Sequence, residues 1–198
     1  MHNLSADSPK FVRGPVEEMT GAAGERVVME CEVDSNPPAE YSWLRGGDAW
    51  ELVGRGPLLT FTLTPSTAGR YTCQAAAPGF SPVRRTGRVR LRGPPTILAS
   101  SAAQFGSRGE TVHVHCETDS VPAAKQFRWK FNGMELSRDS PLFTIIETRD
   151  GSRVKSTVII KNAESHHFGE YLCGVSNEIG QTETVIKLKE IGKNLQLH

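Results

Sequence analysis

Several features that would define a function are missing from this sequence. No apolar run approaches the length needed to cross a bilayer. The N-terminal residues lack the basic region and the apolar stretch of a secretory signal, so we expect an excised segment of a longer protein. The formal net charge is only +1, which excludes an overall electrostatic attraction to nucleic acid or to an anionic membrane.

Signatures of catalysis and of metal binding are also missing. The serines and histidines have no nucleophile-elbow context, and the chain has no glycine-rich phosphate loop. We therefore expect no enzymatic activity and no cofactor. Histidines at 113, 115, 166 and 167 suggest zinc, but no third ligand follows at a recognisable spacing. We expect His113 and His115 to lie on the outer face of a strand, without a metal.

The sequence contains an internal repeat, one copy in each half of the chain. Each half has a glycine seven positions before its first cysteine, a tryptophan twelve or thirteen positions after it, and then a Tyr-x-Cys motif. This is the spacing of an immunoglobulin β-sandwich. We predict an all-β chain of two tandem immunoglobulin-like β-sandwich domains. The repeated residues are Cys31, Trp43, Tyr71 and Cys73 in the first half, and Cys116, Trp129, Tyr171 and Cys173 in the second.

In both halves of the chain, apolar residues alternate with polar ones before the first cysteine. Val27, Met29 and Cys31 share one face of a predicted strand, and Val112 and Cys116 do the same in the second half. A period of two that includes the cysteine places the cysteine in the core.

Four cysteines allow three pairings, and the immunoglobulin resemblance selects one. It implies the bridges Cys31–Cys73 and Cys116–Cys173, each of which stabilises its domain by roughly 4 kcal/mol on a chain-entropy estimate. Each core tryptophan would then pack against a bridge, and each tyrosine would form the tyrosine corner of its domain.

The domain boundary is predicted at a short proline-rich joint. We expect domain 1 at 8–92, a semi-rigid Gly-Pro-Pro linker at 93–95, and domain 2 at 96–190, beginning with a strand at 96–98. The second half has more residues between its tryptophan and its tyrosine, enough for an additional edge strand. We expect a shorter C2/I-like first domain and an I-set-like second domain. Asn132-Gly133 and Asp150-Gly151 are predicted hairpin turns.

A more specific resemblance covers nearly the whole chain. The chain is similar to the fourth and fifth immunoglobulin domains of Roughest/Kirre/Neph-type cell-recognition proteins, and the turn at 175–180 resembles the Asn-x-x-Gly turn of intermediate-set domains. The similar segments are CEVDSNP at 31–37, TAGRYTC at 67–73, PGF at 78–80, LRGPP at 91–95 and IKLKE at 186–190.

The resemblance implies a type I membrane protein with five extracellular immunoglobulin domains, one membrane span and a signalling tail. Such proteins mediate homophilic and nephrin-type heterophilic recognition between cells, chiefly through the membrane-distal first domain. This chain would then be a membrane-proximal spacer at the extracellular face of the plasma membrane. The sequence departs from the wider superfamily at Thr67 and His167, where an aspartate is usual, so we do not expect the buried aspartate–arginine pair.

Basic residues gather on the last predicted strand of domain 1. At this spacing they are candidates for binding sulfated glycans or an acidic partner through charge-assisted contacts. The alternative is a solvated sheet face neutralised by nearby glutamates, where each pair contributes little. The residues are Arg84, Arg85, Arg88, Arg90 and Arg92.

Trp50 and Asn3 each allow a functional interpretation and a simpler one. Trp50 is either an exposed anchor for a partner or a side chain packed on its own hairpin, and we favour the hairpin. Asn3 begins the only glycosylation sequon, in a terminal stretch that need not be native.

Three functions stay open from the sequence. The leading hypothesis is a spacer pair in an adhesion receptor. The second is a ligand- or glycan-binding signalling receptor, whose binding would weaken with salt. The third is an intracellular muscle-type scaffold, in which the cysteines would be reduced.

Overall fold

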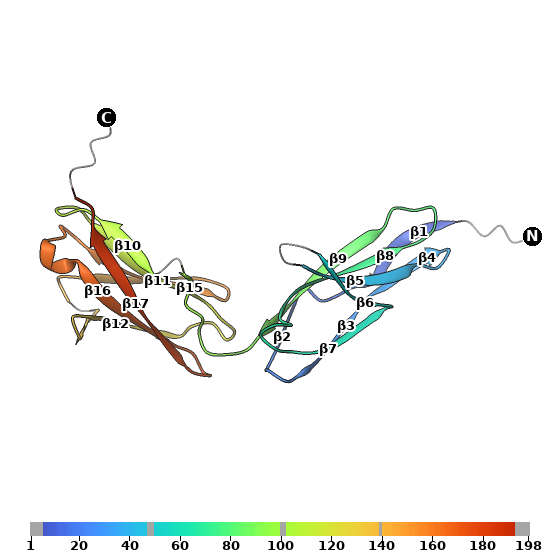
Figure 1. The fold of residues 1–198 in the computed structure, drawn as a ribbon, viewed down its shortest axis with the longest axis horizontal. Coiled ribbons are helices and arrows are strands. Elements are labelled where there is room, and N and C mark those ends of the chain that lie inside the picture. Colours follow the sequence, from blue (N-terminus) through green and yellow to red (C-terminus); the bar gives the residue numbers. More distant parts are fainter. Residues whose placement is uncertain (1–5, 47–49, 100–101, 139, 193–198) are drawn as a thin grey trace, which may run out of the picture. The chain divides into compact units, whose positions relative to one another are not determined.

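The computed structural model describes residues 6–46, 50–99, 102–138 and 140–192. Asn3, the predicted glycosylation site, lies outside these ranges. The chain divides into two compact units, Met1–Arg92 and Gly93–His198, here called domain 1 and domain 2 (Figure 1). Each is a β-sandwich in which a five-stranded sheet faces shorter strand pairings.

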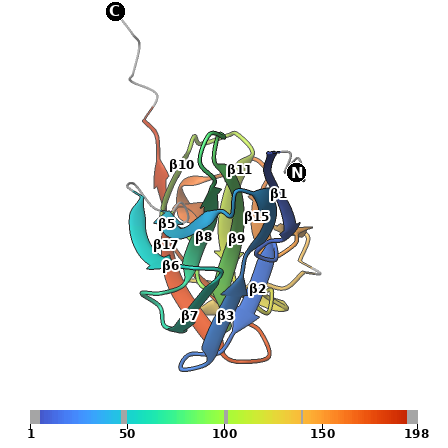
Figure 2. The same ribbon diagram turned by 90° about the vertical axis from the view of Figure 1, so that its right-hand side faces the viewer.

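Domain 1 has nine strands among the described residues. They are β1 (Asp7–Arg13), β2 (Glu18–Gly21), β3 (Arg26–Glu30), β4 (Glu32–Asn36), β5 (Glu40–Gly46), β6 (Glu51–Arg55), β7 (Leu58–Thr62), β8 (Gly69–Ala76) and β9 (Val83–Leu91). The large sheet has the order β2-β9-β8-β5-β6, while β3 pairs with β7 and β1 with β4 (Figure 2). Only β2 and β9 run parallel within these pairings.

The core of domain 1 follows the predicted alternation. Val27, Met29 and Cys31 are buried, and Trp43 has no exposed surface. The Trp43 indole N–H donates to the Gly56 carbonyl at 3.0 Å. Cys31 is bonded to Cys73 on β8, so the bridge joins the two layers of the sandwich.

Domain 2 has the same large sheet order of five strands, but its smaller sheet has three strands where the β3-β7 sheet of domain 1 has two. Its strands are β10 (Ala103–Gly106), β11 (Val112–Asp119), β12 (Gln126–Phe131), β13 (Met134–Glu135), β14 (Thr144–Asp150), β15 (Arg153–Ile160), β16 (Gly169–Ser176) and β17 (Gln181–Glu190), with the 3₁₀ helix η2 (Ser165–His167) before β16. The large sheet has the order β10-β17-β16-β12-β13, and the small one β11-β15-β14.

The extra strand β14 separates the two domain types. It pairs with β15 along its full length at the edge of the small sheet, whereas β7, the counterpart of β15, has β3 as its only partner among the described strands. This confirms the predicted additional edge strand and the distinction between a shorter first domain and a longer second one.

The core of domain 2 has the same residue types at positions equivalent to those of domain 1: a tryptophan, a tyrosine and a disulfide. Trp129 is 1% exposed and donates its indole N–H to the hydroxyl of Ser156 at 2.9 Å. Cys116 on β11 is bonded to Cys173 on β16. The amide side chain of Gln104 bonds both backbone groups of His115, at 2.6 and 2.8 Å, and so ties β10 to the opposite sheet.

Both tyrosines form the corner that the Tyr-x-Cys motif predicts. The Tyr71 hydroxyl donates to the Thr67 carbonyl at 2.5 Å, and the Tyr171 hydroxyl donates to the His167 carbonyl at 2.7 Å. Burial raises the pKa of both hydroxyls, which keeps them protonated as donors.

Thr67 and His167, where an aspartate was expected from the wider superfamily, make local hydrogen bonds to the preceding segment. The Thr67 hydroxyl donates to the Thr62 carbonyl at 2.7 Å, while the Nδ1 atom of His167 accepts the Glu164 N–H at 2.9 Å. In domain 1 the Arg45 guanidinium donates to the carbonyls of Ser66 and Ala68 instead of a carboxylate. Backbone acceptors therefore replace the aspartate–arginine pair here.

Two local predictions need correction. The segment 96–98 is not a strand: Ile97 makes an isolated bridge with Thr118, and the first strand of domain 2 is β10. The second hairpin turn is shifted by one residue, because Asp150 pairs with Arg153 and leaves Gly151 and Ser152 as the loop. The Asn132-Gly133 turn is confirmed, with positive φ at both residues.

The joint residues are held by domain 2. Gly93 N–H donates to the Val121 carbonyl at 2.9 Å, and the Asn177 side-chain amide donates to the Gly93 carbonyl at 2.8 Å. The Thr182 hydroxyl donates to the Pro95 carbonyl at 2.7 Å. Arg92, by contrast, donates its N–H to Gly21 of domain 1 at 2.7 Å. The chain therefore passes from one domain's hydrogen bonds to the other's between Arg92 and Gly93.

Candidate functional site

The candidate site in domain 1 is the outer face of its five-stranded sheet. Side chains alternate along a strand, so Arg84, Arg88 and Arg90 of β9 point away from the core residue Val89. The Arg84 guanidinium donates to the Gln74 side chain on β8 at 2.7 Å. This face holds part of the predicted arginine strip.

The strand register adds one arginine, Arg70, to those of the predicted strip. Arg70 of β8 lies directly opposite Arg88 in the antiparallel pairing of β8 and β9. Like charges directly opposite one another destabilise a sheet. Arg70, Arg84 and Arg88 share this outer face and are called here the arginine face, and an anion bound at Arg70 and Arg88 would relieve their repulsion.

The other three residues of the strip do not join the arginine face. Arg85 lies on the opposite side of β9, with its guanidinium 5.4 Å from the ring centre of Phe11. Arg90 and Arg92 are near glutamates, at 3.8 Å from Glu18 and 3.1 Å from Glu25. The predicted strip therefore divides into two groups. Arg84 and Arg88 are candidates for binding an anion, whereas Arg85 stacks on an aromatic ring and Arg90 and Arg92 lie near glutamates.

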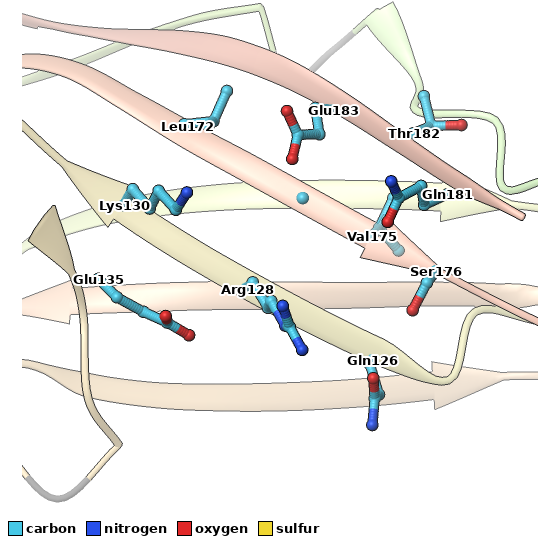
Figure 3. Close-up of a pocket in the computed structure, with 11 residues that line it drawn as sticks. Gln126, Arg128, Lys130, Glu135, Leu172, Val175, Ser176, Gln181, Thr182 and Glu183 are labelled. Atoms are coloured by element: carbon cyan, nitrogen blue, oxygen red, sulfur yellow. The ribbon is translucent and has the colours of Figure 1, made fainter. Parts of the chain in front are cut away.

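The corresponding face of domain 2 has a different chemistry. Glu170 occupies the position of Arg70, and it pairs with the directly opposite Lys187 at 3.2 Å. Farther along the same strands, Gly174 lies between Arg128 of β12 and Glu183 of β17. Because glycine has no side chain, a hollow of about 250 Å³ opens above it, with Arg128 and Glu183 on either side of β16 (Figure 3).

The histidines do not form a metal site in the structure described. His113 and His115 lie on β11, and His166 and His167 lie in η2, with their rings 4.0 Å apart. Within residues 6–46, 50–99, 102–138 and 140–192 there is no group of three or more metal-ligating side chains. Burial lowers the pKa of His115 and, with help from His166, that of His167.

Trp50 is 61% exposed, yet it packs on its own hairpin. A side chain at Gly46 would meet the Trp50 ring at 2.9 Å, so the indole covers that glycine. No helix in the described part of the chain has the length and hydrophobicity of a membrane span.

Comparison with known proteins settles the family. Family profiles described as immunoglobulin domain match residues 13–90 and residues 94–177. Both domains are immunoglobulin domains. A solved complex of Dpr2 Ig1-Ig2 with DIP-Theta Ig1-Ig3 shares the fold of this tandem, with a TM-score of 0.61 at 20% identity, covering 94% of this chain and 66% of that chain.

Two curated relatives of the immunoglobulin tandem are more similar in sequence. The Irregular chiasm C-roughest protein of Drosophila melanogaster is 37% identical over 183 residues, covering 92% of this chain and 24% of that protein. Kin of IRRE-like protein 1 of Homo sapiens is 31% identical over 186 residues, covering 92% of this chain and 24% of that protein. The tandem therefore spans about a quarter of the length of these relatives.

Within each immunoglobulin domain, the interior and the outer sheet face differ in how far sequence reveals them. The cysteines, tryptophans and tyrosines were found from spacing because their positions are set along one chain. Arg70 and the hollow at Gly174 depend on which residues face each other across strands. The only feature of the sequence that could have identified Arg70 is its position next to Tyr71 of the Tyr-x-Cys motif. That motif predicts a strand that neighbours the one with the arginine strip.

Proposed function

We propose that this chain is an extracellular segment of a cell-surface recognition protein, working by binding and spacing rather than by catalysis. The observation that carries the proposal is the 37% identity to the Irregular chiasm C-roughest protein across 92% of the chain. The disulfide in the core of each domain supports an extracellular location, because disulfides such as Cys31–Cys73 and Cys116–Cys173 persist in oxidising compartments.

We further propose that the two domains correspond to the fourth and fifth immunoglobulin domains of the full protein, next to the membrane. A spacer needs units that keep their shape and a joint with few free torsions. Each domain has its own bridge across the sandwich. The joint is Gly93-Pro94-Pro95, where proline restricts the backbone and hydrogen bonds tie Gly93 and Pro95 to domain 2.

The partners expected for such a protein are other cell-surface immunoglobulin proteins, either identical copies or nephrin-like ones. Most of that recognition would lie in domains outside this chain. The Dpr2 and DIP-Theta complex is an example of two proteins with immunoglobulin domains that bind one another.

The spacer role is tested by replacement in the full-length protein. Cells that do not otherwise adhere would express either the native protein or a version in which residues 8–190 are exchanged for an unrelated immunoglobulin tandem of equal length. A spacer predicts unchanged surface staining and unchanged cell aggregation. Loss of aggregation with normal surface staining would show that this segment recognises the partner itself.

The arginine face supports a second candidate function, the binding of sulfated glycans. Its specific support is the unfavourable pairing of Arg70 with Arg88, which nothing in the fold requires. Heparin binding by the full chain would be measured over a range of salt concentrations, since contacts between exposed charges weaken as salt rises.

The paired variant R84A/R88A should reduce heparin affinity at least about tenfold, the effect of losing charge-assisted contacts. The matched control is R90A/R92A, which removes two arginines of the same strip that lie near Glu18 at 3.8 Å and Glu25 at 3.1 Å. Equal losses for R84A/R88A and R90A/R92A would point to general basicity and exclude a site at the arginine face.

A further inference from the structure

The outer face of β12, β16 and β17 in domain 2 has charges of both signs that have no partner among the described residues. Among the described residues, Arg128, Lys130 and Glu183 make no ion pair or side-chain hydrogen bond. On the same face Glu170 and Lys187 do pair, at 3.2 Å. The unpaired charges are therefore specific to the part of the face around Gly174.

These residues form three rows across the sheet. Arg128, Gly174 and Glu183 are aligned in one row, with a positive charge on β12 and a negative charge on β17. On one side of this row, along the strands, Lys130, Leu172 and Val185 form a second row. On the other side Gln126, Ser176 and Gln181 form a third. Each row is centred on β16 (Figure 3).

The arrangement fits a second copy of itself when the two faces are related by a two-fold axis parallel to β16. Such an axis exchanges the β12 side with the β17 side, because a closed two-fold contact places residue i on j and j on i. Arg128 of each copy then lies opposite Glu183 of the other. Leu172 meets Leu172 at the centre, and Gln126 meets Gln181.

The charges also select this axis over its alternative. A two-fold axis perpendicular to β16, in the plane of the interface and through this row, would place Arg128 opposite Arg128 and Glu183 opposite Glu183. Like charges juxtaposed in an interface are unfavourable. The parallel axis makes the row of Arg128 and Glu183 attractive, while Glu170, which is already paired with Lys187 at 3.2 Å, lies opposite Glu170 of the other copy.

Gly174 supplies the room that this contact needs. Packed sheets lie about 10 Å apart, and the row of Arg128 and Glu183 carries long side chains on both sides. The hollow of about 250 Å³ above Gly174 lies between them. Two such hollows facing one another would hold the two Arg128–Glu183 pairs beside the apolar Leu172 contact.

We propose that this face of domain 2 binds the same face of a second copy of this chain, through reciprocal Arg128–Glu183 pairs. The inference rests on the geometry of domain 2 and not on the proposed function. Because the axis is parallel to the strands, the ends of β17 in both copies point the same way, so the contact is side by side rather than head to tail.

The test measures self-association of the full chain by sedimentation equilibrium, in low salt and over a wide concentration range. The wild-type chain should form a reversible dimer. The variants R128E and E183R should each weaken dimerisation at least tenfold, since both create two like-charge contacts in a two-fold interface.

The mixture of R128E with E183R gives the decisive result. A 1:1 mixture should form heterodimers with wild-type-like affinity, because one contact joins the two substituted positions with opposite charges and the other joins the native Glu183 of the R128E chain to the native Arg128 of the E183R chain. The double variant R128E/E183R should dimerise with itself for the same reason. Restoration also shows that the single variants are folded.

K161E is the matched control, because it makes the same change of charge beyond the end of β15 in the small sheet. It should leave dimerisation unchanged. A wild-type chain that stays monomeric at its highest soluble concentration would overturn the proposal. So would a dimer that R128E and E183R do not weaken, or a mixture that restores nothing.

Discussion

The two domains share one interior and differ at the same place on their outer faces. In both, the strand with the second cysteine pairs with the last strand of the domain, and one cross-strand pair lies at equivalent positions. That pair is Arg70 and Arg88 in domain 1, and Glu170 and Lys187 in domain 2. The second pair is an ion pair at 3.2 Å, whereas the first brings two like charges together.

The next pair along the same strands also differs. In domain 1 the hydroxyls of Thr72 and Thr86 are hydrogen-bonded at 2.7 Å, while domain 2 has the apolar pair Leu172 and Val185. The immunoglobulin fold tolerates either chemistry there, because neither pair contributes to the core. The inward face determines the fold, and the outward face is therefore where the two domains can acquire different partners.

The largest expected effect concerns the interior that the domains share. Replacing both cysteines of one bridge, as in C31A/C73A or C116A/C173A, should destabilise the affected domain by about 2–5 kcal/mol. Calorimetry of the full chain should show one lowered unfolding transition and one unchanged transition. A single variant that lowers both transitions equally would contradict the description of two independently bridged interiors.

The next effect distinguishes the two core tryptophans. Trp129 donates to the Ser156 side chain, which has no exposed surface, whereas Trp43 donates to a backbone carbonyl that no substitution removes. S156A should leave a buried indole N–H without an acceptor and destabilise domain 2 by about 1–3 kcal/mol. Urea unfolding checks this value, and an unchanged midpoint would mean that another group accepts the indole N–H.

A smaller effect follows from exchanging the residues of the cross-strand pair. R70E places a glutamate opposite Arg88 and should stabilise domain 1 by about 0.2–1 kcal/mol, while E170R places an arginine opposite Lys187 and should destabilise domain 2 by a similar amount. Thermal unfolding at low salt measures both. No shift in either variant would show that these pairs are fully screened by solvent, and shifts of the same sign would contradict a contribution from the cross-strand charges.

The smallest effect is a dependence on pH that only domain 2 should have. Burial lowers the folded-state pKa of His115 and of His167, so the unfolded state binds protons more readily than the folded one. The histidine contribution is therefore present above the usual histidine pKa of about 6.5 and is lost as pH falls through it toward the lower folded-state values. Domain 1 has no histidine among its described residues.

Unfolding followed from about pH 7.5 to 5.5, around the usual histidine pKa, tests this difference. The transition of domain 2 should move to lower temperature as pH falls, and that of domain 1 should change less. H115Q/H167Q should flatten the dependence of domain 2. An equal dependence in both domains would assign it to carboxylates rather than to these histidines.

The sequence predicted the interior because its signals lie along single strands. The alternation around Cys31 and Cys116 placed these cysteines in the core, and the immunoglobulin resemblance implied their bridges and the tyrosine corners, which the structure contains. The extra strand β14 followed from segment length, and the Asn132-Gly133 turn from the positive φ that both residues tolerate. These features need no knowledge of which strands are neighbours.

The outer faces were predicted less well because they depend on pairing between strands. The arginine strip was identified along β9, but the sequence did not show that Arg85 lies on the other side, against Phe11. Nor did it show that Arg70 faces Arg88, or that Gly174 separates Arg128 from Glu183. Each of these facts is set by the register of a neighbouring strand.

The central claim is that both domains are oxidised sandwiches suited to an extracellular site. The most direct test is the intact mass of the folded chain, expressed through a secretory route and alkylated under denaturing, non-reducing conditions. The account predicts no alkylation, with fragments that link Cys31 to Cys73 and Cys116 to Cys173. Four free thiols in a folded protein would contradict it and make an intracellular scaffold the better explanation.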